Sequence, residues 1–236
     1  MTKDLPSISV IIPVHNGQRY LGEAIDSVLS QGDYSLDVLV VDDGSSDDSA
    51  KIAKSFGPAV RYHYQSQKGA AQARNTGLAL TEGRLIAFLD ADDIWMANKL
   101  TAQLAALTKH TNLDMVFGHT EQFVSPELDD EGRRTLRCPT EPMPAYIPSA
   151  MLVRRDSFNV VGPFSSDFDI GEFVDWYARA MDADLSSLML PEVLLRRRIH
   201  RTNQGVTKRE SYQAEYMRIL RKSLQRRRAA AQKKGE

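Results

Sequence analysis

The sequence contains a single cysteine, Cys138, among its 236 residues. One thiol cannot form an intramolecular disulfide, so a disulfide-stabilised extracellular domain is disfavoured. The sequence also lacks an apolar run near the length of about 20 residues that a membrane-spanning helix needs. Residues 1–6 lack the apolar stretch of a secretory signal. These absences predict a cytoplasmic protein.

A large net charge is missing as well, because 30 Lys and Arg residues balance 31 Asp and Glu residues. A chain without a strongly basic composition gives no reason to expect a nucleic-acid partner. The balance is uneven, however: residues 208–236 hold ten basic and three acidic residues, which leaves residues 1–207 with a net charge of −8. We therefore predict a main domain over 1–207 and a basic tail over 208–236.

The tail has apolar residues at helical spacing, at Tyr212, Tyr216, Ile219, Leu220 and Leu224. Arginine and lysine residues surround them, which predicts a basic amphipathic helix. Such a helix is suited to docking on an anionic membrane surface or on an acidic partner, so the protein can be peripheral at a membrane. The alternative is a helix that packs on the main domain and leaves its basic end in solvent.

Strand and helix signals alternate through the first half of the chain. Short apolar runs rich in β-branched residues predict strands over residues 8–13, 36–41, 60–64, 84–89 and 113–118. Apolar residues at helical spacing predict helices between them, over residues 17–30, 47–56, 70–80 and 96–108. Repeated strand–helix units with fully apolar strands are typical of an α/β fold, in which helices cover both faces of a mostly parallel sheet.

The second half of the chain is less regular. Five prolines with charged residues between them predict an irregular segment over residues 120–148, which flanks the site without forming a new domain. The remaining pattern predicts strands over 150–153 and 193–199 and helices over 173–181 and 211–230.

Three carboxylates follow the fourth predicted strand, at Asp90, Asp92 and Asp93. Carboxylates this close repel one another, and a divalent cation that takes oxygen ligands is the usual remedy. The carboxyl end of a strand in an α/β protein is also where ligands bind. The alternative is a solvated, Asp-rich turn in which Asp93 caps the next helix.

The Gly-X-Gly-X-X-Gly motif of dinucleotide-binding dehydrogenases is absent after the first strand, where the chain reads Pro13-Val14-His15-Asn16-Gly17. Four other segments are present in order, over residues 9–17, 40–47, 69–77 and 88–95. Each segment alone is a weak signal. Together and in this order they resemble family 2 glycosyltransferases, which have the GT-A fold.

The resemblance implies a metal-dependent, inverting transferase. It would move a sugar from a nucleoside-diphosphate sugar, expected to be UDP-linked, to an acceptor that is a glycan, a lipid, a peptide or a small molecule. The first three segments, with the start of the fourth, are implied to bind the nucleotide sugar, through Pro13, His15, Asn16, Asp42, Asp43, Arg74 and Asp90.

Each of these residues also has an ordinary alternative role. Asp42 and Asp43 can form an Asx turn with the glycine that follows, a role compatible with recognition of the base. His15 stands where most relatives have Tyr or Thr, and it can be a plain loop residue. Arg74 can form a structural ion pair with Asp42 or Asp90.

The resemblance assigns the metal to the Asp90-Ala91-Asp92 motif. Asp92 would coordinate Mn²⁺ or Mg²⁺, and Asp90 would contact the ribose or a metal-bound water. His200 follows a Pro-Glu-Val strand at the interval where some relatives have a third metal ligand, and neutral imidazole suits Mn²⁺. The alternative for His200 is a histidine in a surface loop.

An inverting enzyme needs a general base to take the proton of the acceptor. Relatives carry an Asp for this role where this chain has Phe173. Glu172 and Asp175 remain, three positions apart on a predicted helix, and we favour Asp175 because the neighbouring Trp176 can shape an acceptor subsite. Otherwise Glu172 serves helix electrostatics and Asp175 is a surface charge. The missing base also motivates a second hypothesis, a catalytically silent protein that binds sugar nucleotides.

Overall fold

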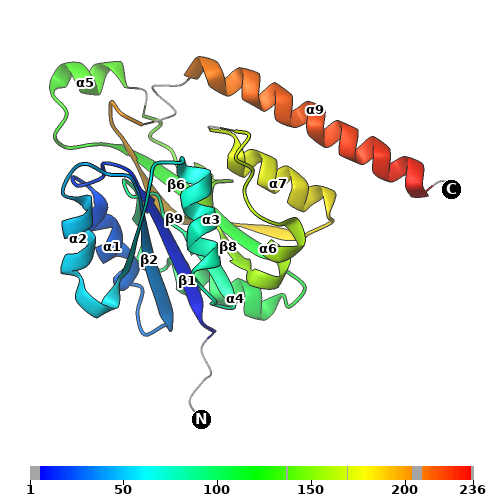
Figure 1. Cartoon of the computed structure of the whole chain (residues 1–236), viewed down its shortest axis with the longest axis horizontal. Helices are drawn as coiled ribbons and strands as arrows, with labels where there is room; N and C mark the ends of the chain where they lie inside the picture. Colours follow the sequence, from blue (N-terminus) through cyan, green and yellow to red (C-terminus); the bar gives the residue numbers. More distant parts are fainter. Residues whose placement is uncertain (1–5, 137, 169, 204–208, 235–236) are drawn as a thin grey trace, which may run out of the picture.

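The computed structural model describes residues 6–136, 138–168, 170–203 and 209–234. Its centre is one mixed β-sheet (Figure 1). The strands are β1 Ile8–Val14, β2 Leu36–Asp43, β3 Arg61–Gln65, β4 Leu85–Phe88, β5 Ile94–Trp95, β6 Met115–Val124, β7 Met143–Pro144, β8 Leu152–Arg154 and β9 Ser187–Ile199. Their order across the sheet is β3-β2-β1-β4-β8-β6-β9-β5, and β7 pairs with β6.

Helices cover both faces of this sheet. They are α1 Leu21–Leu29, α2 Ser49–Ser55, α3 Ala70–Ala79, α4 Lys99–Lys109, α5 Asp130–Thr135, α6 Arg155–Val161, α7 Glu172–Asp182 and α9 Arg209–Lys234, with short 3-10 turns η1 Gly57–Ala59 and η2 Pro148–Ala150. Ile8, Val10 and Ile12 of β1 belong to the apolar layer of α1 and α4, whereas Ile11 belongs to that of α3, α6 and α7. Because successive side chains of a strand point to opposite faces, β1 is buried on both sides. The predicted α/β fold is confirmed.

The sheet consists of two parallel parts. β1 lies between β2 and β4 and is parallel to both, so the carboxyl ends of these three strands meet at one edge. β8 is antiparallel to β4 and to β6, and it connects the first part to the parallel pair of β6 and β9. The chain leaves β1, β2 and β4 at this common edge through the segments singled out in the sequence.

The segment over residues 120–148 is more regular than the sequence predicts. β6 continues to Val124, because its second half pairs with β9 from Leu195 to Ile199. The short helix α5 and the strand β7 follow, and η2 leads into β8. Helix α6 is a further element that the sequence pattern does not predict.

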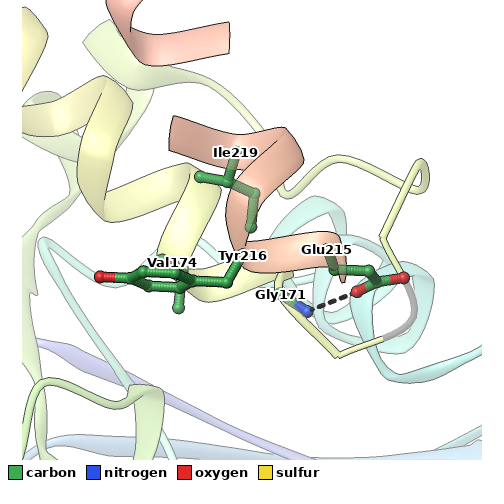
Figure 2. A pocket seen from close by; sticks show the side chains of 5 residues that line it. All are labelled: Gly171, Val174, Glu215, Tyr216 and Ile219. Atoms are coloured by element: carbon green, nitrogen blue, oxygen red, sulfur yellow. Dashed lines mark hydrogen bonds between the residues drawn. The ribbon is translucent and has the colours of Figure 1, made fainter. Parts of the chain in front are cut away.

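Most of the predicted basic tail forms the long helix α9, which lies along α7 (Figure 1). Ile219 is 1% exposed and packs at Gly171 and Val174, at the start of α7 (Figure 2). The tail helix therefore packs on the main domain, which is the alternative given above for residues 208–236. None of the described helices is long and apolar enough to cross a membrane.

The predicted apolar side of the tail is only partly buried. Ile219 points inward, whereas the other apolar residues with described side chains are 41–54% exposed: Tyr216, Met217, Leu220 and Leu224. The side chain of Tyr212 lies outside the described part of α9. Helical spacing places these residues roughly on one side of the helix. Packing against α7 then buries Ile219 and leaves the others partly exposed.

Candidate active site

A cavity of about 830 Å³ opens where β1, β2 and β4 end. Small-molecule sites in proteins have volumes of about 300–1,000 Å³. The segments after β1, β2 and β4 line one side of this cavity. Residues 146–148, the start of α7 and the end of β9 line the other side. We call these two sides the motif side and the α7 side.

On the motif side, the loop after β1 is fastened to the loop after β2. Asn16 donates its backbone N–H to Ser45 Oγ over 2.9 Å, and its Oδ1 accepts the backbone N–H of Ser46 over 2.8 Å. Asn16 has a φ of 53°, a left-handed conformation that asparagine adopts more readily than most residues. Pro13 and Asn16 both line the cavity.

His15 is held at the cavity wall in a defined tautomer. Its Nδ1 lies 2.9 Å from the carbonyl oxygen of Asp43, which can only accept, so the hydrogen bond requires a proton on Nδ1. Its Nε2 then accepts from the side-chain amides of Asn16 and Gln67, each at 3.2 Å. These three contacts give His15 a more defined position than a plain loop residue has.

Asp42 is buried and forms the turn that follows β2. Its carboxylate accepts the backbone N–H of Ser45 over 2.8 Å, and Gly44 adopts the left-handed φ of 79°. The Asx turn considered from the sequence is therefore present. The second oxygen accepts the hydroxyl of Tyr62 over 2.7 Å. Burial and this carboxylate raise the pKa of Tyr62, so its hydroxyl remains a donor to Asp42.

Asp43, unlike Asp42, lines the cavity. Its carboxylate accepts hydrogen bonds from the Gln65 side chain and from the backbone N–H groups of Lys68 and Gly69, over 2.7–2.8 Å. An ionised carboxylate has about four acceptor sites. Asp43 therefore orders the loop before α3 and keeps capacity for one further donor, such as a ring N–H of a base.

Arg74, on α3, connects the two sides of the cavity. It is buried and donates from Nη2 to Asp90 Oδ1 over 2.6 Å and from Nη1 to Glu172 Oε1 over 2.7 Å. Burial lowers the pKa of Arg74, but the two carboxylates outweigh this effect and raise it, so the guanidinium stays charged. The ion pair with Asp90 is one of the alternatives considered above, and the ion pair with Glu172 is new.

Asp92 and His200 meet inside the cavity. Asp92 follows β4 and His200 follows β9, and His200 Nε2 lies 2.9 Å from Asp92 Oδ2. The side-chain nitrogen of Asn203 lies 3.1 Å from the same oxygen. His200 is 8% exposed, so it is not a surface-loop histidine. Among the residues with described side chains, no group of three or more His, Cys, Asp or Glu is placed to hold a metal.

Asp93 does not cap the helix that follows it, so that prediction is wrong. It is buried, and its Oδ1 accepts the backbone N–H of Arg198 over 3.1 Å. The next two residues form β5, which pairs with β9, and α4 begins only at Lys99. Burial, together with the carboxylates of Asp92 and Asp90, raises the pKa of Asp93.

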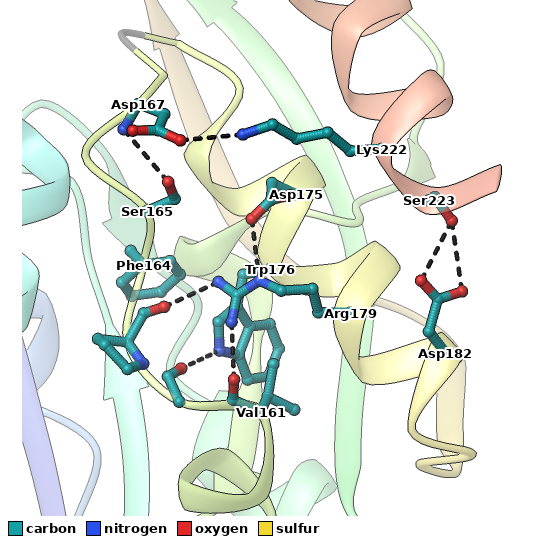
Figure 3. Close-up of polar contacts among 12 residues, drawn as sticks. Val161, Phe164, Ser165, Asp167, Asp175, Trp176, Arg179, Asp182, Lys222 and Ser223 are labelled. Carbon is teal, nitrogen blue, oxygen red and sulfur yellow. Dashed lines mark hydrogen bonds and ion pairs between the residues drawn. The ribbon is translucent and has the colours of Figure 1, made fainter. Parts of the chain in front are cut away.

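Glu172 lines the cavity at the first turn of α7, whereas Asp175 does not reach the cavity. Asp175 is buried and pairs with Arg179 over 2.9 Å (Figure 3) and with Arg226 of α9 over 3.7 Å. It is therefore not a surface charge either. Burial raises the pKa of Glu172, and the ion pair with Arg74 opposes this rise.

Trp176 belongs to the hydrophobic core. It is fully buried, its ring is stacked on that of Phe158 at 4.8 Å between centroids, and its N–H donates to the carbonyl of Gly162. The predicted contribution of Trp176 to an acceptor subsite is wrong, because its side of α7 packs on α6. The reason for favouring Asp175 over Glu172 disappears with it.

Arg197 and Tyr146 are two of the cavity residues that the sequence did not single out. Arg197 lines the cavity, while its neighbours Arg196 and Arg198 pair with Glu121 and Glu23. The alternation of side chains along β9 is the signal that separates Arg197 from the other two.

The second is Tyr146, 47% exposed, which lines the α7 side together with Phe173. Its ring contacts the rings of Phe117 and Tyr177, with centroids 5.2 and 5.3 Å apart. No pattern marks Tyr146, since it lies in the irregular segment.

The comparison with protein families agrees with this geometry. The Glycosyl transferase family 2 model matches residues 9–162, which contain the ends of β1, β2 and β4. The chain belongs to glycosyl transferase family 2. The resemblance seen in the sequence is thereby confirmed, and the protein is a glycosyltransferase.

Two relatives illustrate the range of this family. An uncharacterized glycosyltransferase of Rickettsia typhi is 30% identical over 238 aligned positions, which cover 92% of this chain and 72% of the relative. The UDP-Glc:alpha-D-GlcNAc-diphosphoundecaprenol beta-1,3-glucosyltransferase WfgD of Escherichia coli is 37% identical over 131 positions, which cover 51% of each chain.

Solved structures of other glycosyltransferases show that this family 2 enzyme has the GT-A fold. The mannosyltransferase PcManGT of Pyrobaculum calidifontis, in complex with GDP-Man and Mn²⁺, superposes with a TM-score of 0.68 at 19% identity, covering 94% of this chain and 65% of its own. S. aureus TarS 1–349 in complex with UDP-GlcNAc superposes with a TM-score of 0.67 at 19% identity, covering 84% and 60%. The chain spans less than two thirds of each of these structures.

Proposed function

We propose that this family 2 enzyme is a metal-dependent, inverting glycosyltransferase with a UDP-linked sugar as its donor. The observation that carries the proposal is the meeting of Asp92 and His200 beside the Arg74–Asp90 ion pair, inside a cavity large enough for a nucleotide sugar. The names of two of the compared proteins include UDP-Glc and UDP-GlcNAc, and a third was solved with GDP-Man. We propose UDP rather than GDP because UDP occurs in the first two of these three.

The residues present fit a divalent cation. Asp92 and His200 offer a carboxylate oxygen and an imidazole nitrogen at one point, a donor set that suits Mn²⁺ and, less well, Mg²⁺. When bound, such a cation neutralises charge on the diphosphate leaving group. Arg74 adds a charged guanidinium whose Nε is buried without a hydrogen-bond partner in the described part of the chain. Asp43, His15 and Asn16 would hold the nucleotide on the motif side.

We propose Glu172 as the general base, in preference to Asp175, because Glu172 lines the cavity. Arg74 binds Oε1 of Glu172 and favours its ionised form, which leaves Oε2 outside that ion pair. A carboxylate in this place can take the proton of the acceptor hydroxyl. The acceptor oxygen then bonds to the anomeric carbon as the bond from that carbon to the diphosphate breaks.

A thermal-shift screen tests this function. UDP-Glc, UDP-GlcNAc and GDP-Man are each added with Mn²⁺, with Mg²⁺ or with EDTA, and slow donor hydrolysis is measured in parallel. We expect stabilisation by a UDP-sugar that requires the metal, together with hydrolysis. Full hydrolysis by the metal-stripped protein would contradict the metal requirement. Metal-dependent binding without hydrolysis or transfer supports the alternative of a silent sugar-nucleotide-binding protein.

We further propose that the outer face of α9 docks on an anionic lipid bilayer. Leu220 and Leu224 are exposed on that face, and the exposed Arg221 and Arg228 lie beside them on the helical wheel. Exposed apolar residues flanked by arginines suit a negatively charged interface. A cytoplasmic location is still a prediction from the sequence.

Co-sedimentation with vesicles tests this docking. The full chain is mixed with vesicles of phosphatidylcholine alone and of phosphatidylcholine with phosphatidylglycerol. The matched variants are Leu220→Ser with Leu224→Ser on the outer face, and Val160→Ser, an exposed apolar residue on α6. We expect binding to the anionic vesicles that the α9 variant loses and the α6 variant keeps. Equal sedimentation of all three proteins, or self-association without vesicles, would contradict the docking.

A further inference from the structure

Helix α7 obtains its N-terminal cap from α9. The N-cap residue of α7 is Gly171, which has no side chain to cap the helix. Instead, Glu215 Oε2 accepts the backbone N–H of Ile170 over 3.1 Å and of Gly171 over 3.2 Å (Figure 2). Gly171 is the N-cap residue of α7, where a helix start leaves donors unpaired, and Ile170 lies directly before it. A carboxylate there also interacts favourably with the positive end of the helix dipole.

The contact beside this cap is unusually close. A Cβ atom added to Gly171 would lie 2.6 Å from Ile219 Cδ1, so any larger residue at position 171 would displace the Ile219 side chain. Val174, one turn along α7, contacts Tyr216 and Ile219 on one side and lines the large cavity on the other. The start of α7 is therefore a thin layer between α9 and the cavity.

Ion pairs hold the rest of α9 along α7. Asp182 pairs with Arg226 over 2.9 Å and with Arg227 over 2.7 Å, and Ser223 also donates to it (Figure 3). Lys222 pairs with Asp167 over 2.9 Å in the segment that leads into α7, but both side chains are well exposed. Exposed pairs contribute little stability, about 0–1 kcal/mol each. The buried contacts at the start of α7 are therefore the more sensitive part of this interface.

We propose that α9 is a positioning element of the active site and that Glu215 is its positioning residue. Glu215 and Ile219 fix the first turn of α7, and that turn carries Glu172 into contact with Arg74. The proposal rests on the proposed role of Glu172 in the cavity. Glu215 itself touches neither substrate nor the reacting atoms.

The two sides of the cavity should respond differently when this cap is removed. The motif side is built on β1, β2 and β4, which α9 does not support. A displacement of about 1 Å in a catalytic group can lower the rate about 10²-fold. Loss of the cap should therefore lower turnover and leave nucleotide affinity unchanged.

The test uses variants of the full chain. Glu215→Leu removes the acceptor oxygen, whereas Glu215→Gln retains an amide oxygen that can accept the same N–H groups. Ile219→Ala removes the buried contact, and its matched control is Met217→Ala, which truncates a side chain that is 51% exposed. Three quantities are measured: hydrogen exchange of the amides of residues 170–175, UDP affinity with Mn²⁺ by calorimetry, and turnover in donor hydrolysis.

We expect Glu215→Leu and Ile219→Ala to accelerate exchange at residues 170–175 at least about tenfold, the effect of losing a net hydrogen bond or more. Turnover should fall about 10- to 10²-fold at unchanged UDP affinity. Glu215→Gln should retain most of the protection and turnover, and Met217→Ala all of it.

Unchanged exchange at residues 170–175 in Glu215→Leu would overturn the proposal. A loss of UDP affinity as large as the loss of turnover would also overturn it. If Glu215→Leu does not fold, Ile219→Ala and Glu215→Gln decide by the same exchange measurement. If the wild-type protein neither binds UDP nor hydrolyses donors, the proposed function fails, and hydrogen exchange still shows whether α9 holds α7.

Discussion

The two sides of the cavity are constructed in different ways. On the motif side, the loops after β1 and β2 and the loop before α3 hold one another through hydrogen bonds, such as those between Asn16 and Ser45 and between Asp43 and Gly69. On the α7 side, the position of Glu172 depends on Arg74 of α3 and on Glu215 of α9, which come from distant parts of the chain. The motif side thus carries its own structure, and the α7 side takes its structure from its neighbours.

This difference has a functional consequence. The motif side, where the donor is proposed to bind, has loops that hold one another in place. The α7 side, where the acceptor is proposed to bind, depends on contacts from other elements. The α7 side has an aromatic wall with Tyr146 and Phe173. If Glu172 is the proposed base, this wall lies on the side of the cavity that would face the acceptor hydroxyl.

The largest expected effect lies at the proposed metal site, where the two sides meet. Asp92→Asn should lower turnover by about 10³- to 10⁴-fold, because several kcal/mol of charge stabilisation are lost at 1.36 kcal/mol per factor of ten. Donor hydrolysis with saturating Mn²⁺ measures this effect, and circular dichroism checks the fold. Turnover within tenfold of the wild type would show that Asp92 does not hold the metal.

A second substitution separates two carboxylates of the α7 side. Glu172→Gln should lower turnover at saturating donor about 10²-fold, as expected for loss of a general base. Asp175→Asn should keep near wild-type turnover but lower the melting temperature by a few degrees, because Arg179 loses its carboxylate partner and Arg226 keeps only Asp182. A larger loss of turnover in Asp175→Asn than in Glu172→Gln would contradict Glu172 as the general base.

A third substitution tests whether the α7 side contributes to the metal. His200→Ala should weaken Mn²⁺ affinity at least about tenfold, the range seen when metal-site contacts are removed. Its affinity for UDP without metal should change much less, since the motif side is intact. Mn²⁺ titration of the variant and the wild type measures both quantities. Superimposable titration curves would exclude His200 as a ligand.

The smallest expected effect concerns the diphosphate. Arg197→Ala should weaken UDP binding about tenfold, in line with about 1.5 kcal/mol for a hydrogen bond to a charged group. Arg196→Ala is the matched control, because Arg196 pairs with Glu121 away from the cavity. Calorimetry with UDP and Mn²⁺ compares the two. Equal losses in both variants would show that the alternation along β9 does not select Arg197.

The sequence by itself determined the α/β class, the buried strands and the grouping of Asp43, Asp90 and Asp92 at one edge of the sheet. These features follow from local rules. Apolar runs predict strands, and the carboxyl ends of neighbouring parallel strands meet at one edge. The family resemblance, which the comparison confirms, rests on the same contiguous segments.

Only the tertiary structure decided which residues face the cavity on the α7 side. Periodicity shows that Glu172 and Asp175 lie three positions apart on a helix, but not which of them faces the cavity. That choice depends on what packs against α7. Trp176 stacks on Phe158 of α6 in the core, and Asp175 pairs with Arg226 of α9. The same packing turns Ile219 inward and its apolar neighbours outward. Such contacts join residues far apart in the chain, and their partners cannot be found from spacing within one helix.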